Sequence, residues 1–313
     1  MNACAASSAA SAATARPDDP SGDPCARPWI VAIEASTTVT SVALADRQGR
    51  LMAQRWIDGP RAASQRLLPD LDALMREFGI APGQAGPASQ AGAAGAVAAV
   101  AVAHGPGGFT GLRVALTLAK TVARAGGARR YGFSTLEAMA ARWPGAGDMI
   151  CPALDARRGE VYGGAYRIGA SGERPALLLA DAVETAESLA GRLAKLLATL
   201  ATDARDACDA RDAHDARAGQ ERPRIWLGGS GARRYRDVLA TALGDAAGWI
   251  PAQLGDPAAD SLALLGAAAL RAGDPGVDPL AVAPVYLRPS DAEKRHGIDV
   301  TAPVLLPEGA GAS

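Results

Sequence analysis

A glycine-rich turn at residues 104–113 is the part of this sequence where chemistry is first expected. Its sequence, His-Gly-Pro-Gly-Gly-Phe-Thr-Gly-Leu-Arg, follows an apolar run typical of a buried strand and opens a stretch with helical periodicity. The N-terminal amides of such a helix can hold an anion, and Thr110 is expected to cap it. The turn matches neither a P-loop nor a dinucleotide-binding loop. Its glycines, with Gly107 and Gly108 as candidate cofactor contacts, predict close approach by a ligand or by another protein.

A second candidate group follows the first apolar run of the chain, at Glu34-Ala-Ser-Thr-Thr38. An acid beside hydroxyl groups can serve a metal-bound phosphate, and Ser36 and Thr37 are the candidate cofactor-binding donors. The same residues also make an ordinary turn, in which Ser and Thr hydroxyls bond their own backbone. Both interpretations stay open.

A third group lies in the second half of the chain, where Asp155 and Glu160 flank Arg157 and Arg158. The two carboxylates form a candidate pair, and the arginines form a candidate anion site. The alternative is a charged turn closed by its own Asp–Arg ion pairs, each contributing about 1 kcal/mol or less when exposed. No histidine lies close in sequence, so the pattern favours the structural turn.

Two predicted helices in the first half carry apolar stripes. In the helix expected at 111–125, alanines recur at every fourth position and leave a shallow face on which another helix can lie. The helix expected at 62–78 has a wide apolar arc, and Pro69 predicts that it starts or kinks there. Each stripe covers the chain's own sheet or faces a partner. The candidate partner-interface residues are Leu67, Leu71, Leu74, Met75, Phe78, Gly111, Leu112, Ala115, Ala119 and Ala123.

The elements that must position these groups repeat in two halves. The first half predicts strands at 29–33, 41–45, 51–57, 97–103 and 130–133, with the two helices between them. The second half predicts strands at 148–154, 161–167, 176–180 and 224–227, a helix at 186–200, another after 228–231 and a last helix at 261–272. The predicted fold is α/β, with duplicated β-β-β-α-β-α-β lobes of the actin, sugar-kinase and Hsp70 (ribonuclease H-like) type and a cleft between the lobes.

The expected domain organisation follows from this pattern. An N-terminal lobe is predicted at 29–128, a C-terminal lobe at 129–259, and a helix and strand that pack back on the body at 260–290. Three further segments have low-complexity or unpatterned sequence: an extension at 1–28, an Asp-Ala-X insertion at 203–217 and a tail at 291–313.

Composition excludes several classes of protein. The 313 residues carry a net charge of −1, which does not favour nucleic-acid binding through bulk electrostatics. The four cysteines lack disulfide or metal-ligand spacing and the three histidines form no pair, so no metal site is predicted and a cytoplasmic location is expected. No apolar run reaches the ~18 residues of a membrane span.

Taken in order, the motifs resemble those of the TsaB family, whose members are partner subunits in the synthesis of tRNA threonylcarbamoyladenosine. The matching segments are 32–37 (Ala-Ile-Glu-Ala-Ser-Thr), 104–113, 153–162 (Ala-Leu-Asp-Ala-Arg-Arg-Gly-Glu-Val-Tyr) and 284–288 (Pro-Val-Tyr-Leu-Arg). The resemblance covers roughly 28–290. Where the family usually has Asp-Thr-Ser, this chain has Glu34-Ala-Ser, which weakens any expectation of autonomous ATP chemistry.

The resemblance implies a scaffold subunit with no catalytic residues and no cofactor of its own. Its implied partners are the catalytic subunit TsaD, docked on the N-lobe helices, and the ATPase TsaE. A homodimer through the same helices is also implied, tRNA is an indirect partner, and ATP or ADP at the partner interface stays open. The alternative from another class is a small-molecule kinase or ATPase that uses the inter-lobe cleft near Ser36 and Gly107. A peptidase is disfavoured, because neither metal ligands nor a Ser/His/Asp arrangement stands out.

Overall fold

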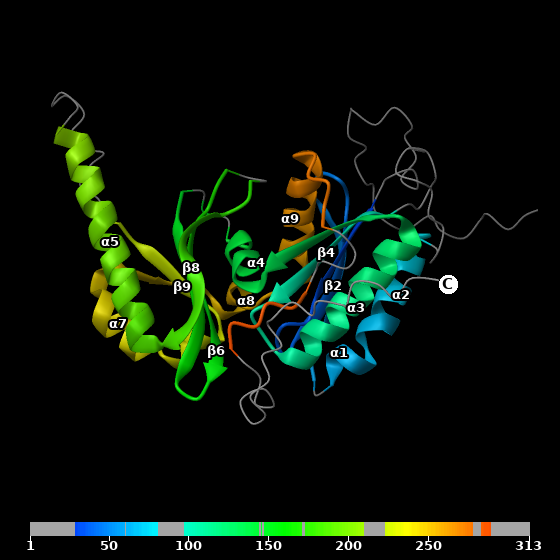
Figure 1. Cartoon of the computed structure of the whole chain (residues 1–313), viewed down its shortest axis with the longest axis horizontal. Coiled ribbons are helices and arrows are strands. Elements are labelled where there is room, and N and C mark those ends of the chain that lie inside the picture. Colours follow the sequence, from blue (N-terminus) through cyan, green and yellow to red (C-terminus); the bar gives the residue numbers. More distant parts are fainter. Residues whose placement is uncertain are drawn as a thin grey trace, which may run out of the picture.

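The computed structural model describes residues 29–59, 61–80, 97–143, 145, 147–170, 173–209, 223–277 and 283–288. The predictions made for 1–28, for 291–313 and for the insertion beyond residue 209 lie outside the described residues. The described part forms two lobes side by side, each built on its own sheet (Figure 1).

The N-terminal lobe is a five-stranded sheet in the order β3-β2-β1-β4-β5. Its strands are β1 (Trp29–Glu34), β2 (Thr40–Ala45), β3 (Leu51–Ile57), β4 (Val97–Gly105) and β5 (Arg129–Ser134). β1 to β3 form an antiparallel meander, whereas β4 and β5 run parallel to β1. β1 and β2 are buried at every residue, as expected for strands covered by helices on both faces.

The two faces of this sheet differ in side-chain size. One face carries large residues such as Val31, Ile33 and Leu44, and packs against α1 (Ala62–Gln65), α2 (Leu67–Glu77) and α3 (Phe109–Gly126). The other face carries mainly alanine and packs against α9 (Ala259–Arg271). A Cβ at Gly266 of α9 would lie 3.0 Å from the Ala101 Cβ, so the small side chains let α9 lie close to the sheet.

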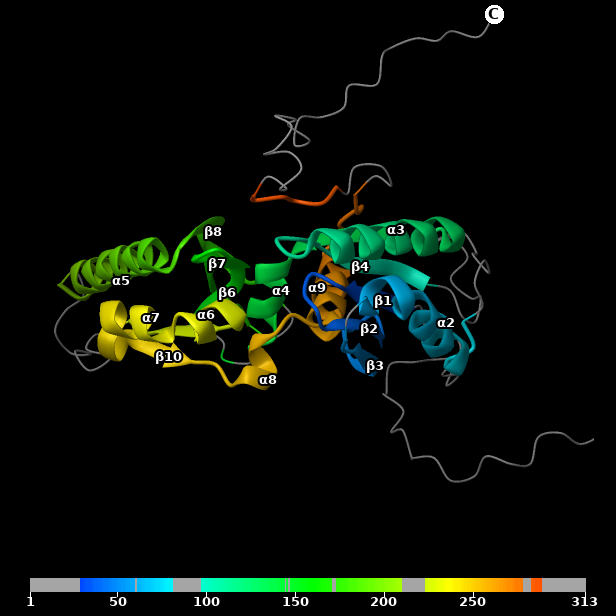
Figure 2. The same ribbon diagram turned by 90° about the horizontal axis from the view of Figure 1, so that it is seen from below.

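The C-terminal lobe repeats this topology, with strand order β10-β9-β6-β7-β8. Its strands are β6 (Met149–Arg157), β7 (Glu160–Arg167), β8 (Ala176–Thr185), β9 (Ile225–Gly228) and β10 (Ala247–Trp249). Its helices are α5 (Ala186–Asp209), α6 (Ser230–Arg234), α7 (Arg236–Leu243) and α8 (Ala252–Gly255), with a 3-10 turn at Gly244–Ala246. Figure 2 shows α5 and α7 on the side of this lobe away from the N-lobe. The predicted duplication and fold class are confirmed.

Several boundaries differ from prediction. The lobe boundary at 128/129 is wrong by one strand, because β5 pairs with β4 in the N-lobe sheet. The helix expected at 62–78 is two helices that meet at Arg66, and Pro69 is the third residue of the second. The helix α4 (Thr135–Ala141), which lies between the lobes, was not predicted. Residues 203–209 of the predicted insertion continue α5 as helix.

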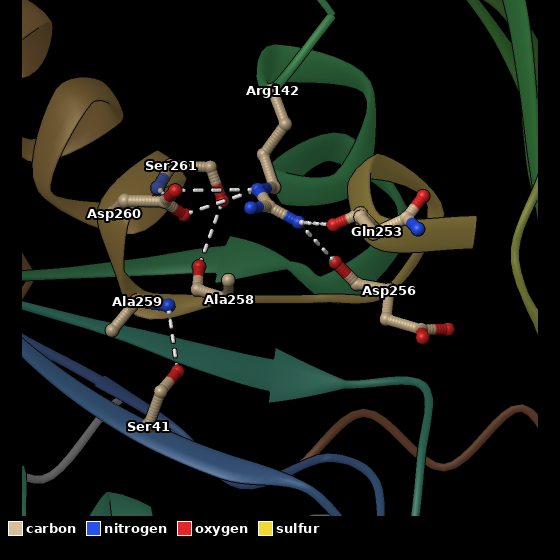
Figure 3. A network of polar contacts seen from close by, with 8 residues as sticks. All are labelled: Ser41, Arg142, Gln253, Asp256, Ala258, Ala259, Asp260 and Ser261. Atoms are coloured by element: carbon tan, nitrogen blue, oxygen red, sulfur yellow. Dashed lines mark hydrogen bonds and ion pairs between the residues drawn. The ribbon is translucent and has the colours of Figure 1, made fainter. Parts of the chain in front are cut away.

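The two chain crossovers between the lobes meet at Arg142, directly after α4 (Figure 3). Its Nε lies 3.2 Å from a carboxylate oxygen of Asp260, and its NH1 donates to the carbonyls of Gln253 (3.1 Å) and Asp256 (3.0 Å). Ser41 of β2 accepts the first N–H of α9, from Ala259, at 2.9 Å. Arg142 therefore ties the outgoing crossover to the segment by which the chain returns to the N-lobe.

Candidate functional site

The glycine turn packs against the hairpin between β1 and β2 of the same chain. A Cβ at Gly107 would lie 2.5 Å from the Ser36 carbonyl oxygen, and a Cβ at Gly111 would lie 2.0 Å from that of Ala35. Both distances are too short for any side chain. At Gly107 and Gly111 the close approach expected of these glycines is made by the chain's own backbone.

The N-terminus of α3 is also occupied by this hairpin. Gly108, not Thr110, is the N-cap, and Thr110 is the second residue of the helix, so the predicted cap is wrong. The N–H of Gly108 donates to the Ser36 carbonyl at 2.6 Å. The partial negative charge of this carbonyl lies where the positive end of the helix dipole would attract an anion. The arrangement is a closed version of an anion-binding turn.

The contacts of Glu34 and Thr37 favour the interpretation of this hairpin as a self-contained turn. Glu34 is fully buried, and its Oε1 accepts the backbone N–H of Ser36 at 2.5 Å. Burial raises the pKa of Glu34 to about 7, partly offset by hydrogen bonds from Ser36. Thr37 donates its hydroxyl to the Val39 carbonyl at 2.9 Å. A buried carboxyl and a hydroxyl bonded to its own turn are poor ligands for a metal-bound phosphate.

The charged turn between β6 and β7 resolves into separate ion pairs. Asp155 pairs with Arg234 at 3.3 Å, and Glu160 pairs with Arg288 at 3.0 Å. The two carboxylates are thus engaged with different cations from outside the turn, whereas the structural alternative expected Asp–Arg pairs within it. Arg157 differs from these residues, because its exposed side chain has no hydrogen bond or ion pair with the described residues.

A pocket of about 430 Å³ lies between the lobes, next to Arg157. Gly107 and Phe109 line it from the N-lobe, and Tyr162 lines it from the C-lobe. Residues 283–288, here called the C-terminal strap, supply a third wall through Tyr286 and Arg288. The hydrogen bonds of this segment to both lobes show that it packs back on the body, but it forms no strand, contrary to the prediction.

Most of the candidate partner-interface residues face their own sheet. Seven of them belong to the core between α2, α3 and the N-lobe strands: Leu67, Leu71, Leu74, Met75, Ala115, Ala119 and Ala123. Leu112 is fully buried, and Phe78 packs edge-on against Trp29 with 5.5 Å between ring centroids. Gly111 packs against Ala35, as described above. The eight buried residues of this set are covered by the chain itself, whereas Phe78 and Gly111 remain partly exposed.

Other sites have less to offer chemically. Within the described ranges, no three His, Cys, Asp or Glu side chains gather where they could hold a metal ion. Burial raises the pKa of the Cys151 thiol to about 12 and lowers the pKa of His104 below its usual value. The helices of the described part are all too short or too polar to cross a membrane.

Sequence reasoning missed a polar network between the lobes. Ser134 donates to Asp181 at 2.5 Å, and Tyr166 donates to the other oxygen of that carboxylate at 2.6 Å. Ser134 also accepts the N–H groups of Leu136 and Glu137 as the N-cap of α4. The sequence did carry a signal here, since Ser134-Thr-Leu-Glu137 has the spacing of a capping box. Nothing local pointed to Asp181, which lies 47 residues further on.

Comparisons with known proteins agree on one group. Two curated proteins named tRNA threonylcarbamoyladenosine biosynthesis protein TsaB are similar to this chain. The protein from Bacillus subtilis (strain 168) is 32% identical over 138 residues, and that from Escherichia coli (strain K12) is 30% identical over 149 residues. Each alignment covers 44% of this chain, and 55% and 54% of the two relatives. The chain thus spans about half the length of the curated relatives it matches.

Two solved structures are similar to this chain over almost their entire length. The crystal structure of a Pseudomonas aeruginosa protein with similarity to the peptidase YeaZ superposes with a TM-score of 0.60 at 28% identity, over 83% of this chain and 100% of that one. A structure of YeaZ from the same organism gives 0.59 at 27% identity, over 83% and 99%. The TsaD family model, described as tRNA N6-adenosine threonylcarbamoyltransferase, matches residues 61–295. Because that model covers most of the chain, the protein belongs to the TsaD family with its actin-like fold, and within it is a relative of the TsaB proteins.

Proposed function

We propose that this chain is the non-catalytic partner subunit of a complex that adds threonylcarbamoyl to the adenosine next to the anticodon of tRNA. The observation that carries the proposal is the closed glycine turn. In this chain the carbonyls of Ala35 and Ser36 occupy the approach to α3 that a phosphate would need. The pathway in the proposal is inferred from the two curated relatives, which are named for threonylcarbamoyladenosine biosynthesis. The small-molecule kinase or ATPase alternative loses support for the same reason.

We propose that TsaD docks on the exposed faces of α2 and α3, because their buried faces are already covered. Thr117 and Thr121 lie on the outer side of α3, and Leu68 of α2 has 61% of its surface exposed. An exposed leucine on α2 and exposed threonines on α3 suit packing of a partner helix. TsaE joins this complex in our proposal, a homodimer of the free chain uses the same faces, and tRNA is contacted by the partner. The complex works in the cytoplasm.

The docking proposal is tested with two matched variants. Thr121 in α3 and Thr199 in α5 are both exposed helix residues, and each hydroxyl donates to the carbonyl four residues earlier, at 2.9 and 3.1 Å. Thr121→Arg is expected to reduce co-purification with TsaD at least tenfold, whereas Thr199→Arg leaves it unchanged. Equal recovery of TsaD by both variants, with unchanged circular dichroism, would overturn docking on α3.

The pathway itself is tested in cells. Depletion of the chain, followed by mass spectrometry of tRNA nucleosides, is expected to remove threonylcarbamoyladenosine, and re-expression restores it. Normal levels of the nucleoside after depletion would refute the proposed function. To test the alternative, the purified chain is assayed for ATP turnover, and an activity lost on Ser36→Ala would favour an ATPase.

A nucleotide at the partner interface is a second, separate proposal. The inter-lobe pocket offers the Arg157 guanidinium, which has no ion pair with the described residues, for a phosphate, and the rings of Phe109, Tyr162 and Tyr286 for a base. ATP or ADP fits this combination of groups. In calorimetric titration of the purified chain and of its complex with TsaD, Arg157→Ala is expected to weaken ADP binding at least tenfold. Equal affinity in wild type and variant contradicts the assignment of this pocket.

A further inference from the structure

The C-terminal strap holds on to the N-lobe at three points. The N–H of Val285 donates to the His104 carbonyl at the end of β4, at 2.8 Å. The ring of Tyr286 stacks on Phe109 with 5.1 Å between centroids, and its hydroxyl accepts the Nε–H of Arg113 at 3.0 Å. A Cβ at Gly105 would lie 2.6 Å from the Val285 carbonyl oxygen, so only glycine lets the strap lie this close.

Two residues further on, the strap holds the C-lobe. One nitrogen of the Arg288 guanidinium donates to the Ala156 carbonyl at 2.8 Å, and another lies 3.0 Å from the Glu160 carboxylate. Both contacts are on the hairpin between β6 and β7. The Arg288 side chain is 18% exposed, so this ion pair is shielded more than a typical surface pair. Figure 2 shows the strap running from the α3 side of the molecule toward the C-lobe sheet.

The lobes are also joined at the two chain crossovers. There α4 packs against strands of both sheets, and Arg142 binds the returning segment through Gln253, Asp256 and Asp260 (Figure 3). Two-lobed proteins that close around a ligand move about a few hinge residues and are free elsewhere. Here the strap adds a further attachment to those at the crossovers and at Asp181, and it lies across the pocket between Gly107 and Arg157.

We propose that residues 283–288 act as a clasp that locks the two lobes together, so that the cleft does not open and close. The clasp is made of side chains that reach opposite lobes, Tyr286 to α3 and Arg288 to the β6–β7 hairpin. Its effect is to fix the orientation of α3, and of the surface beside it, relative to the C-lobe. The inference concerns the free chain and does not depend on the proposed function.

The test measures the distance between the lobes directly. Spin labels are attached at Thr121→Cys in α3 and Thr199→Cys in α5, both exposed, in the full chain. Cys151 is buried and is retained, and the other three cysteines are replaced by serine. Pulsed electron–electron double resonance is expected to give one narrow distance distribution for the wild-type clasp. Combining Tyr286→Ala with Arg288→Ala is expected to broaden it at least twofold.

The matched control is Val285→Ala, which trims a partly exposed side chain but keeps the backbone N–H that bonds His104. It is expected to leave the width unchanged. An unchanged width in the double variant, with native circular dichroism, would overturn the clasp. If the double variant does not fold, Arg288→Gln replaces it, because this change removes the guanidinium contacts with the C-lobe and keeps the Tyr286 contacts with α3. A distribution that stays as narrow as in wild type would again overturn the proposal.

Discussion

Replacing Gly111 by alanine tests the central feature of the site, the contact of the glycine turn with its own hairpin. The added Cβ would lie 2.0 Å from the Ala35 carbonyl oxygen, far inside the distance at which the two atoms normally touch. Ala35 cannot move away easily, because it is buried and follows directly on the buried strand β1. The hairpin must therefore shift by more than 1 Å, or α3 must tilt.

The expected magnitude combines three effects. Overpacking of a buried site costs about 3 kcal/mol, and loss of the Gly108–Ser36 hydrogen bond adds about 1 kcal/mol. The better helix propensity of alanine returns up to about 1 kcal/mol. The free energy of unfolding is thus expected to fall by about 3 kcal/mol. The matched control is Gly126→Ala in the same helix, where the nearest atoms lie at 3.8 and 3.9 Å and the expected change lies between zero and a gain of about 1 kcal/mol.

Urea denaturation, followed by circular dichroism at 222 nm, measures both variants under identical conditions. The midpoint of Gly111→Ala should drop while the slope of the transition stays constant, and the midpoint of Gly126→Ala should stay or rise. Stabilities of the two variants within about 0.5 kcal/mol of each other would refute the reasoning. Such a result would mean that the space beside Gly111 is open, as a ligand-binding turn requires.

Three further predictions concern other parts of the chain. Burial raises the folded-state pKa of Glu34 to about 7, so the free energy of unfolding falls as the pH rises from the unfolded pKa of 4.5 to about 7. The stability of Glu34→Gln relative to wild type should therefore increase by about 3 kcal/mol between pH 4.5 and 8 in parallel urea melts. A stability difference that stays constant over this range would contradict the prediction. Ala119→Arg places a charge in the N-lobe core and should abolish cooperative thermal unfolding, whereas a native-like melting curve would mean that the alanine stripe faces outward. Arg142→Leu removes the cation paired with Asp260 and the donor to two carbonyls, and should lower the free energy of unfolding by about 2 kcal/mol in urea melts; an unchanged midpoint would contradict this.

The order of most strands and helices was predictable because those elements have their own local pattern, whereas α4 and α8 were not predicted. β1 and β2 are continuous apolar runs, and the glycine turn separates strand from helix in both halves of the chain. The lobe boundary was not predictable in this way. Only pairing with β4 decides which sheet β5 joins, and the sequence of β5 does not contain that information. Likewise Arg142 and Asp260 are separated by 118 residues, and their contact depends on how α4 and α9 pack.

The alanine stripe of α3 shows why a surface is harder to predict than an element. A spacing of i, i+4, i+8 states that Ala115, Ala119 and Ala123 share one face, but not what lies on that face. Both a partner helix and the chain's own sheet accept small residues. The opposite face of α3 holds Arg113, Thr117 and other polar residues, and it is exposed to solvent in the free chain. The polarity of that face indicates that the alanine face is the one that packs on the sheet.

The glycine turn at the start of α3 shows that the same glycine spacing can serve ligand binding or packing within the chain. Glycines beside a helix N-terminus are needed wherever an electron-rich oxygen must come within hydrogen-bonding distance of the first amides. A phosphate oxygen and a peptide carbonyl oxygen both satisfy that requirement, and sequence spacing does not distinguish them. In this chain the carbonyls of Ala35 and Ser36 fill the position, and Glu34 is drawn into the core beneath them. A geometry that suits phosphate binding is therefore used to join the first hairpin to α3, which fixes the helix on which we propose that a partner docks.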